Sequence, residues 1–262
     1  MALNESIVLT GYSAITARGD FTSRGKSTFA GAFADSSRSL SGAEANTIAD
    51  FDIKNYPVSK KTYLDRCSAL ALAAAALALQ DAEISYPPQD AARFGITLGT
   101  HYGCIDTMKS FSDNITEKGA RHANALLFSH SYFNSPISLC AIEFGLQGYH
   151  NTVCAGANSG LEAVRLAHDA IAAGHAEVML CGAVDALTTA RIEMNPSENA
   201  SEAAVFFVLE KSTFAAARGV KVLLEVDETF WESTFESPFD FGDCGAANSA
   251  LGVLSQISRV QI

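Results

Sequence analysis

The segment Asn151–Ala186, NTVCAGANSGLEAVRLAHDAIAAGHAEVMLCGAVDA, says more about the fold than any other part of the sequence. Residues 151–154 predict a short buried strand, and Asn158 or Ser159 is a suitable N-cap for a following helix. Apolar residues recur in that helix at helical spacing and predict one buried face: Leu161, Val164, Ala167 and Ile171. Gly174 is predicted to end the helix. The segment therefore predicts a strand, a sharp turn and an amphipathic helix.

This segment resembles the nucleophile elbow of the β-ketoacyl synthases, the condensing enzymes of fatty-acid and polyketide assembly. The family pattern is matched without a gap at Thr152, Val153, Ser159, Gly160, Leu161, Ala163, Gly174, Ala176, Met179, Gly182 and Ala186. A thiol at such a turn lies at a helix N-terminus, where backbone N–H groups favour the thiolate. The position of the family's reactive cysteine is occupied here by Ala157. The resemblance thus implies the family fold without its nucleophile, because a methyl group cannot attack a thioester.

The resemblance also implies that the catalytic histidines are missing. Condensing enzymes of the family carry two histidines in their C-terminal half, in H-G-T-G-T-like and N-x-F-G-F-G-G-like motifs. All six histidines of this chain lie before residue 176, at positions 101, 122, 130, 150, 168 and 175. Cys154 is predicted to be a buried structural cysteine that points into the sheet. No pair of residues is assigned to acid–base catalysis, and the chain is not expected to be an enzyme.

The resemblance is collinear over about residues 6–226. It includes Ile7–Thr16 as an opening strand, a helix within Lys60–Ile84, and a strand and turn at Phe94–Gly103. Later, Gly242–Ile257 resembles a family segment in which Asp243 occupies the position of a histidine, and it predicts a final helix. The expected fold is α/β, a thiolase-like layered fold in one domain over residues 1–262, abridged in its C-terminal half after about residue 226. Such an abridged fold is expected to leave a broad apolar surface that needs a partner.

Composition limits the possible functions. The chain has 262 residues and 48% hydrophobic content, enough for a sizeable core. Its net charge of −11 argues against nucleic acid as a ligand, and against acidic acyl carrier proteins as direct strong ligands. The six cysteines lack C-x-x-C spacing, which favours the reducing cytoplasm and argues against a zinc site. We expect no metal, no cofactor, no signal peptide and no membrane span, since the apolar run Ala69–Leu79 is too short.

Within the family, the missing cysteine and histidines resemble the chain-length factor of type II polyketide synthases. This subunit pairs with a catalytic ketosynthase, and through the complex it meets the acyl carrier protein indirectly. The resemblance places the interface on the strand Gln147–Cys154 and on Phe133–Leu146, FNSPISLCAIEFGL. The interface residues implied are Asn134, Ile137, Gln147, His150, Thr152 and Cys154. For many of the apolar positions, ordinary core packing is an equally good interpretation.

The same resemblance assigns an acyl tunnel to the helix after the Phe94–Gly103 turn. Ile105, Met108 and Ser112 lie on one helical face at i, i+3 and i+7, and Phe133 is added from the neighbouring segment. These side chains are slimmer than the aromatics of restrictive family members, so a long straight chain such as a polyene is expected to pass. Among type II systems the aryl polyene pathways of Gram-negative bacteria fit best. The alternative for this helix is simple packing on its neighbours.

Two other functions stay open from the sequence. One is an acyltransferase or malonyl decarboxylase of the thiolase fold that uses Cys154 or His150. The other is a structural partner that only solubilises its ketosynthase. The chain alone is expected to be poorly soluble. A short helix is predicted near Ser27–Phe33, within an otherwise irregular stretch.

Overall fold

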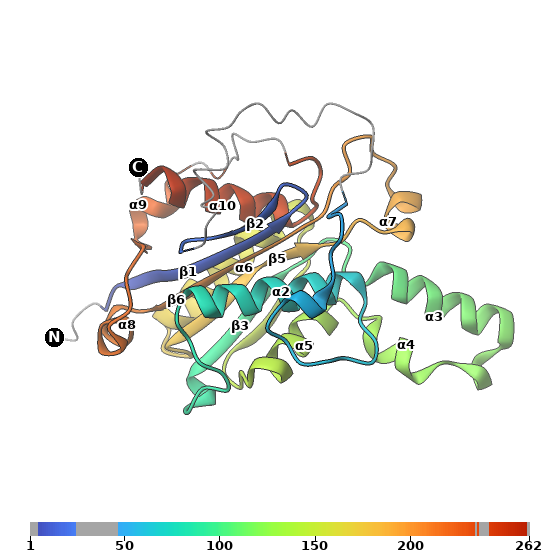
Figure 1. Cartoon of the computed structure of the whole chain (residues 1–262), viewed down its shortest axis with the longest axis horizontal. Coiled ribbons are helices and arrows are strands. Elements are labelled where there is room, and N and C mark those ends of the chain that lie inside the picture. The colour runs from blue at the N-terminus through green and yellow to red at the C-terminus, as the bar shows by residue number, and fades with distance from the viewer. Residues whose placement is uncertain (1–4, 25–46, 234, 236–240, 261–262) are drawn as a thin grey trace.

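The computed structural model describes residues 5–24, 47–233, 235 and 241–260. Its centre is a seven-stranded sheet in the order β2-β1-β6-β5-β3-β4, with β7 paired to β1 (Figure 1). The strands are β1 (Ile7–Thr16), β2 (Gly19–Thr22), β3 (Phe94–Gly99), β4 (His150–Val153), β5 (Val178–Asp185), β6 (Ala203–Lys211) and β7 (Leu224–Glu225). β3 runs parallel to β4 and β5, whereas β6 is antiparallel to β5 and β1. The carboxyl ends of β3, β4 and β5 therefore meet at one edge of the sheet.

Helices cover both faces of this sheet. They are α2 (Arg66–Asp81), α3 (Ile105–Lys118), α4 (Ala125–His130), α5 (Ser135–Phe144), α6 (Ser159–Ala172), α7 (Thr189–Met194), α8 (Ser212–Arg218), α9 (Glu228–Trp231) and α10 (Ala247–Val260). One core lies between the sheet and α2 and α5, and a second lies between the sheet and α6 and α10. The layered α/β prediction is confirmed. The helix expected near Ser27–Phe33 falls outside the described residues.

Helix α2 contains the most apolar run of the sequence and is buried almost all round. Its alanines and leucines from Leu70 to Ala76 are all inaccessible to solvent. The small alanine side chains let the helix approach the sheet on one side and α5 on the other. The prediction of a buried helix over Ala69–Leu79 is confirmed. In the part of the chain that is described, no helix combines the length and the apolar character needed to cross a membrane.

The opposite helical layer is α6 with α10. Val164, Ala167 and Ile171 face the core as predicted, and Gly174 follows the end of α6 with a positive φ of 77°. A Cβ at Gly160 would lie 2.6 Å from the Ala246 carbonyl oxygen, so only glycine permits this contact between the start of α6 and the turn before α10. Among the described residues of these two helices, no large hydrophobic side chain is exposed. The broad apolar surface expected of an abridged fold is therefore not found on this layer.

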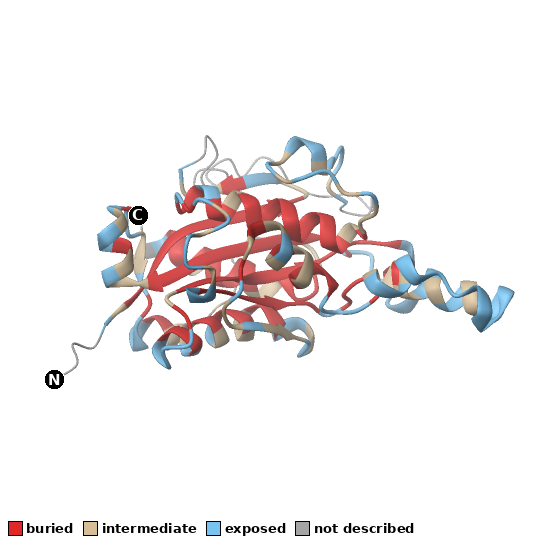
Figure 2. Ribbon diagram, turned by 90° about the horizontal axis from the view of Figure 1, so that it is seen from below, coloured by how far each residue is buried: buried red, intermediate tan, exposed pale blue. Residues whose placement is uncertain are grey.

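Exposed apolar side chains gather elsewhere, on an arm formed by residues 105–134. Helices α3 and α4 project from the body, and the arm is largely exposed (Figures 1 and 2). Four of its large apolar side chains are between 36% and 47% exposed: Leu126, Phe128, Tyr132 and Phe133. The two helices contact each other through the rings of Phe111 and Phe128, whose centroids are 5.4 Å apart. The arm thus presents aromatic surface that the rest of the described chain does not cover.

Candidate functional site

The elbow forms between the end of β4 and the start of α6. A single 3-10 turn, Gly156–Asn158, joins them, and Gly156 adopts a positive φ of 69°. The Ser159 hydroxyl donates to the Gly156 carbonyl at 2.6 Å and accepts from the Ala155 N–H at 2.8 Å. Asn158 occupies the N-cap position of α6, but its side chain makes no capping hydrogen bond. Of the two predicted caps, Ser159 is therefore the residue whose side chain holds the turn.

Ala157 lies in this turn and is exposed. The nearby Ser159 hydroxyl is fully buried, and both of its hydrogen bonds are to the backbone of the turn. The Ser159 hydroxyl is therefore engaged in holding the turn. The elbow therefore has the strand–turn–helix shape that the sequence predicts, with the Ala157 side chain exposed in its turn.

Cys154 was predicted to be buried, and this prediction is wrong. The strand ends at Val153, one residue earlier than the sequence indicated, and Cys154 is exposed in the turn that follows. Partial burial, and then the negative charge of Asp185, raise the pKa of the Cys154 thiol. The thiol is therefore protonated at neutral pH, which disfavours nucleophilic attack.

His150 does not form a catalytic pair with Cys154. The two residues are four apart along an extended segment, which separates their Cα atoms by about 13 Å. Partial burial lowers the pKa of His150, so its imidazole is neutral at physiological pH. A histidine base acting on a cysteine needs hydrogen-bonding distance to the thiol. The arrangement therefore lacks a histidine–thiol contact between these two residues.

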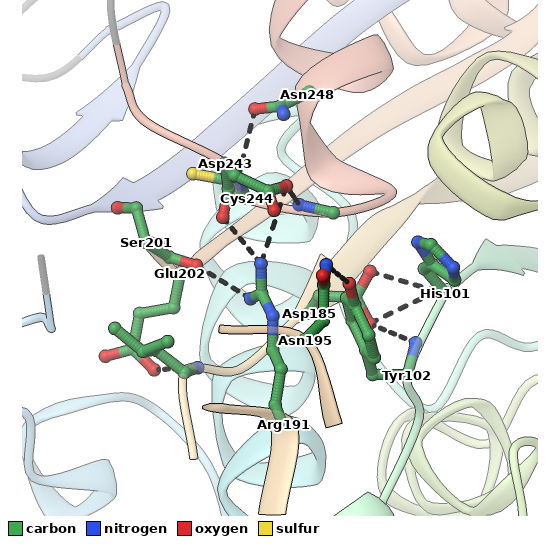
Figure 3. Close-up of polar contacts among 12 residues, drawn as sticks. His101, Tyr102, Asp185, Arg191, Asn195, Ser201, Glu202, Asp243, Cys244 and Asn248 are labelled. Atoms are coloured by element: carbon green, nitrogen blue, oxygen red, sulfur yellow. Dashed lines mark hydrogen bonds and ion pairs between the residues drawn. The ribbon is translucent and has the colours of Figure 1, made fainter. Parts of the chain in front are cut away.

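The most connected polar group beside the elbow is Asp185, at the end of β5 (Figure 3). Its buried carboxylate accepts from the Thr100 hydroxyl and the Tyr102 N–H, both at 2.8 Å. It also accepts from the His101 N–H at 2.9 Å and the Ala246 N–H at 2.7 Å. Burial is the main influence on this carboxyl and raises its pKa, although the hydrogen bonds oppose the shift. Asp185 thus ties the turn after β3 and the start of α10 to the end of β5.

Arg191 forms a second buried centre next to Asp185 (Figure 3). It is 1% exposed, and its guanidinium donates to the carbonyls of Ser201 at 2.7 Å and Asp243 at 2.6 Å. The guanidinium also lies over the Tyr102 ring, 4.5 Å from its centroid. The Asp243 carboxylate, at the predicted position of a family histidine, is 3.6 Å from Arg191 and accepts from the Gly245 N–H. Asp243 therefore stabilises a turn and is not placed as a catalytic base.

Neither Asp185 nor Arg191 is among the site residues that the sequence predicts. The signal for Asp185 was a lone acidic residue at the end of the apolar strand VMLCGAVD, and Arg191 had no comparable signal. Another buried carboxylate, Glu202, pairs with Arg66 through two hydrogen bonds of 2.8 and 2.5 Å. No group of three or more potential metal ligands occurs within the described ranges. The buried charged groups of Arg191 and Glu202 are therefore held by hydrogen bonds to other residues of the fold.

The predicted tunnel residues lie on the arm. Ile105 and Met108 are half-buried on α3, and Ser112 is exposed farther along the helix. Phe133 packs its ring against Gly103, at the start of the arm. The four residues thus belong to one projecting element, and their role in a tunnel stays a prediction.

The predicted interface residues fall into two groups. His150 is exposed on β4, and Gln147 before the strand and Cys154 after it are exposed as well. Thr152 of β4 is half-buried, and its hydroxyl has no hydrogen-bond partner among the described residues. β4 is the last strand of the sheet, paired only with β3 among the described strands. Asn134 is likewise exposed.

Ile137 differs from the other interface residues. It is fully buried in the core with α2, so a partner cannot reach it. Its assignment as an interface contact is corrected on this ground.

Comparison with known proteins gives a family match over most of the chain. Residues 5–197 match the β-ketoacyl synthase, N-terminal domain. The tetracenomycin polyketide synthase ketoacyl synthase alpha subunit of Streptomyces glaucescens is 30% identical over an aligned length of 202, and the match covers 65% of this chain and 47% of that protein. The chain therefore spans about half the length of the curated relatives it matches.

Solved structures share the fold. The ishigamide ketosynthase/chain length factor matches 86% of this chain and 62% of its own, with a TM-score of 0.68 and 20% identity. The second match is one chain from the structure of a type II polyketide synthase acyl-carrier protein in complex with its ketosynthase bound to the hexaketide. The match covers 86% of this chain and 68% of that chain, with a TM-score of 0.69 and 22% identity. The layered fold of this chain is therefore that of the thiolase-like ketosynthases.

Proposed function

This chain belongs to the β-ketoacyl synthase family, and we propose that it serves there as a non-catalytic chain-length factor paired with a catalytic ketosynthase. The observation that carries the proposal is Ala157, an exposed methyl group at the reactive position of an otherwise intact elbow. The elbow is kept in shape by Gly156 and Ser159, neither of which supplies a nucleophile. A chain that keeps the fold without the reactive group can still pair with a catalytic ketosynthase and contribute to the shape of the shared site.

The nearby groups support a non-catalytic role. The Cys154 thiol has a raised pKa and lies far from His150, while Asp243 is held by Arg191. We assign the chain to the cytoplasm, where free cysteines stay reduced. Condensation would then take place on the partner, and the acyl carrier protein would meet this chain only through the complex.

The partner surface that we propose combines β4 and the arm. An edge strand offers unpaired backbone groups to a strand from another chain, and exposed aromatics favour protein interfaces. β4 has such an edge, and the arm exposes Phe128 and Tyr132. A heterodimer formed here would bury Gln147, His150, Thr152 and Cys154 beside the new strand pair.

The substrate that we propose is a growing polyketide or polyene chain that extends along α3. Ile105, Met108 and Ser112 repeat on one face of this helix, and concave apolar sites often lie between subunits. None of the three is aromatic, which supports an extended product such as an aryl polyene. A bulky residue on this face should therefore shorten the product.

The test is co-expression of the tagged chain with its catalytic ketosynthase, followed by size-exclusion chromatography and product analysis. A one-to-one complex is expected, and Ser112→Phe is expected to shorten its products. Ser110→Phe is the matched control, because Ser110 is exposed on the same helix about 200° away around the axis. If the complex forms but Ser112→Phe leaves its products unchanged, this chain would be a structural partner that does not control product length. Failure to form the complex would refute the pairing itself.

One observation favours a second function, an acyltransferase or malonyl decarboxylase: the Cys154 thiol is exposed beside the elbow. This alternative predicts that Cys154→Ala abolishes activity of the purified complex. The chain-length factor predicts full product formation by the same variant. The two functions are therefore separated by one substitution.

A further inference from the structure

Asp65 holds the N-termini of two helices at once. It is the N-cap of α2, where its carboxylate accepts from the Cys67 N–H at 2.8 Å. The same carboxylate accepts from the Thr107 hydroxyl at 2.7 Å and from the Thr107 N–H at 3.4 Å, in the first turn of α3. Asp65 and Thr107 are 5% and 1% exposed. A buried anion that faces two helix N-termini is favoured by both sets of N–H groups.

The contact continues to the far side of the arm through Tyr63. The Thr107 hydroxyl donates to Asp65, so it accepts from the Tyr63 hydroxyl at 2.8 Å. The Tyr63 ring in turn meets His130, the last residue of α4, edge-on with a centroid separation of 5.2 Å. These contacts link the body to the start of α3 and the end of α4. We call Asp65, Thr107 and Tyr63 the root relay.

Besides the root relay, α3 contacts the body mainly through α7. Thr107 is its one buried residue among the described positions. On another side of the same turn, the Asp106 carboxylate accepts from the Ala190 N–H at 2.8 Å. The remaining length of α3 packs mainly on α4 within the arm (Figure 1). A helix of 14 residues is about 21 Å long, so a small tilt at the root moves the outer end much farther than the root.

We propose that the residues of the root relay are positioning residues, which set the direction of the arm and thereby the length of the product. This inference rests on the proposed function, because product length depends on α3 only if α3 lines the tunnel. Met108 and Ser112 follow Thr107 on the same helix, so their positions depend on how the first turn is held. The relay acts through α3 and touches no reacting atom.

Thr107→Val tests the proposal in the complex with the catalytic ketosynthase. Valine keeps the shape of threonine but removes the hydroxyl that bridges Asp65 and Tyr63. Thr107→Ser retains that hydroxyl. Thr116→Val is the matched control, because the Thr116 hydroxyl donates only to the Ser112 carbonyl within α3. The two readouts are amide hydrogen exchange, compared between α3 and α2, and the length distribution of the products.

In Thr107→Val, the first-turn amides of α3 are expected to exchange at least about tenfold faster, because a hydrogen bond to a charged group is lost. The product distribution should shift at the same time. The α2 amides should not change, since the Asp65 contact with Cys67 remains. Thr107→Ser and Thr116→Val should match the unsubstituted complex in both readouts.

Unchanged exchange in Thr107→Val would overturn the proposal. Faster exchange with an unchanged product distribution would overturn it too, provided that Ser112→Phe shortens the products in parallel. If Ser112→Phe also leaves the product distribution unchanged, the tunnel is refuted, and the proposal fails together with the function on which it rests. The exchange readout needs no product and therefore separates these two failures.

Discussion

Two regions lie outside the sheet: the layer of helices α6 and α10, and the arm of α3 and α4. They differ in how far their apolar side chains are exposed to solvent. Leu251 and Leu254 of α10 are completely buried against the chain's own core. Leu126 and Phe128 of the arm are nearly half exposed. The first region is covered within this chain, whereas the second leaves aromatic surface exposed to solvent.

The comparison also shows why the expected apolar surface is absent from the helical layer. α10 packs on α6 and the sheet, and Trp231 of α9 lies across the outer side of α6. There it contacts Arg165, which lies over its ring at 5.6 Å, and His168 at 5.5 Å. The layer is therefore covered by segments late in the chain. A partner is better sought at the arm and β4.

The largest expected effect lies in the buried layer. Leu254→Ala should lower the free energy of unfolding by about 3 kcal/mol, because it leaves a cavity between α10 and the sheet. Leu126→Ala, the same substitution on the exposed arm, should change stability by less than about 0.5 kcal/mol. Urea unfolding of the two variants measures the difference. Equal losses would mean that the arm is as well packed as the layer.

Asp185→Asn should have the next largest effect, a loss of about 2 kcal/mol, because an amide nitrogen would face backbone N–H donors. The loss should also depend on pH. Burial raises the pKa of Asp185, so its contribution to stability is complete below the ordinary carboxyl pKa and falls as pH rises through the raised value.

Asparagine does not titrate, so the loss caused by Asp185→Asn should be larger below the ordinary carboxyl pKa, at about pH 3.5, than at about pH 8. Chemical denaturation at the two values measures it. A loss that stays constant with pH would contradict the raised pKa.

On the arm, function should change more than stability. Phe128→Ser is expected to weaken binding to the ketosynthase about tenfold, as removal of an aromatic contact from an interface does. The free energy of unfolding should fall by less than about 1 kcal/mol. Val222→Ser is the matched control, because Val222 is similarly exposed but lies outside the arm. Equal affinity of the two variants would place the interface elsewhere.

The smallest effect concerns Cys154. Its raised pKa predicts slow alkylation by iodoacetamide near neutral pH and a rate that increases as pH rises. The other five cysteines are buried and should react more slowly. Protection of Cys154 in the complex would support β4 as the interface, which unchanged reactivity would contradict. Mass spectrometry of the labelled peptide gives the rate.

The sequence predicts local features better than distant contacts. The helix after the elbow and its end at Gly174 follow from apolar spacing and one glycine, and both are found. Cys154 was misplaced because a strand that ends one residue earlier moves it out of the sheet. Asp185 binds Ala246, 61 residues away, and no local pattern encodes such a contact.

The sequence also does not predict which side chains of the arm are exposed. Phe128 and Phe144 both occur in apolar helical segments, yet one is 47% exposed and the other is fully buried. The difference arises because α5 lies against α2, whereas α4 projects from the body. Apolar spacing predicts which face of a helix is apolar, but the tertiary fold decides whether that face is covered.

The elbow shows that a reactive site and its scaffold can be separated. The turn depends on the positive φ of Gly156 and on two hydrogen bonds of the Ser159 hydroxyl, and no side chain at position 157 takes part. The shape of the turn therefore does not depend on the side chain at position 157. An alanine at position 157 therefore leaves the architecture of the turn intact.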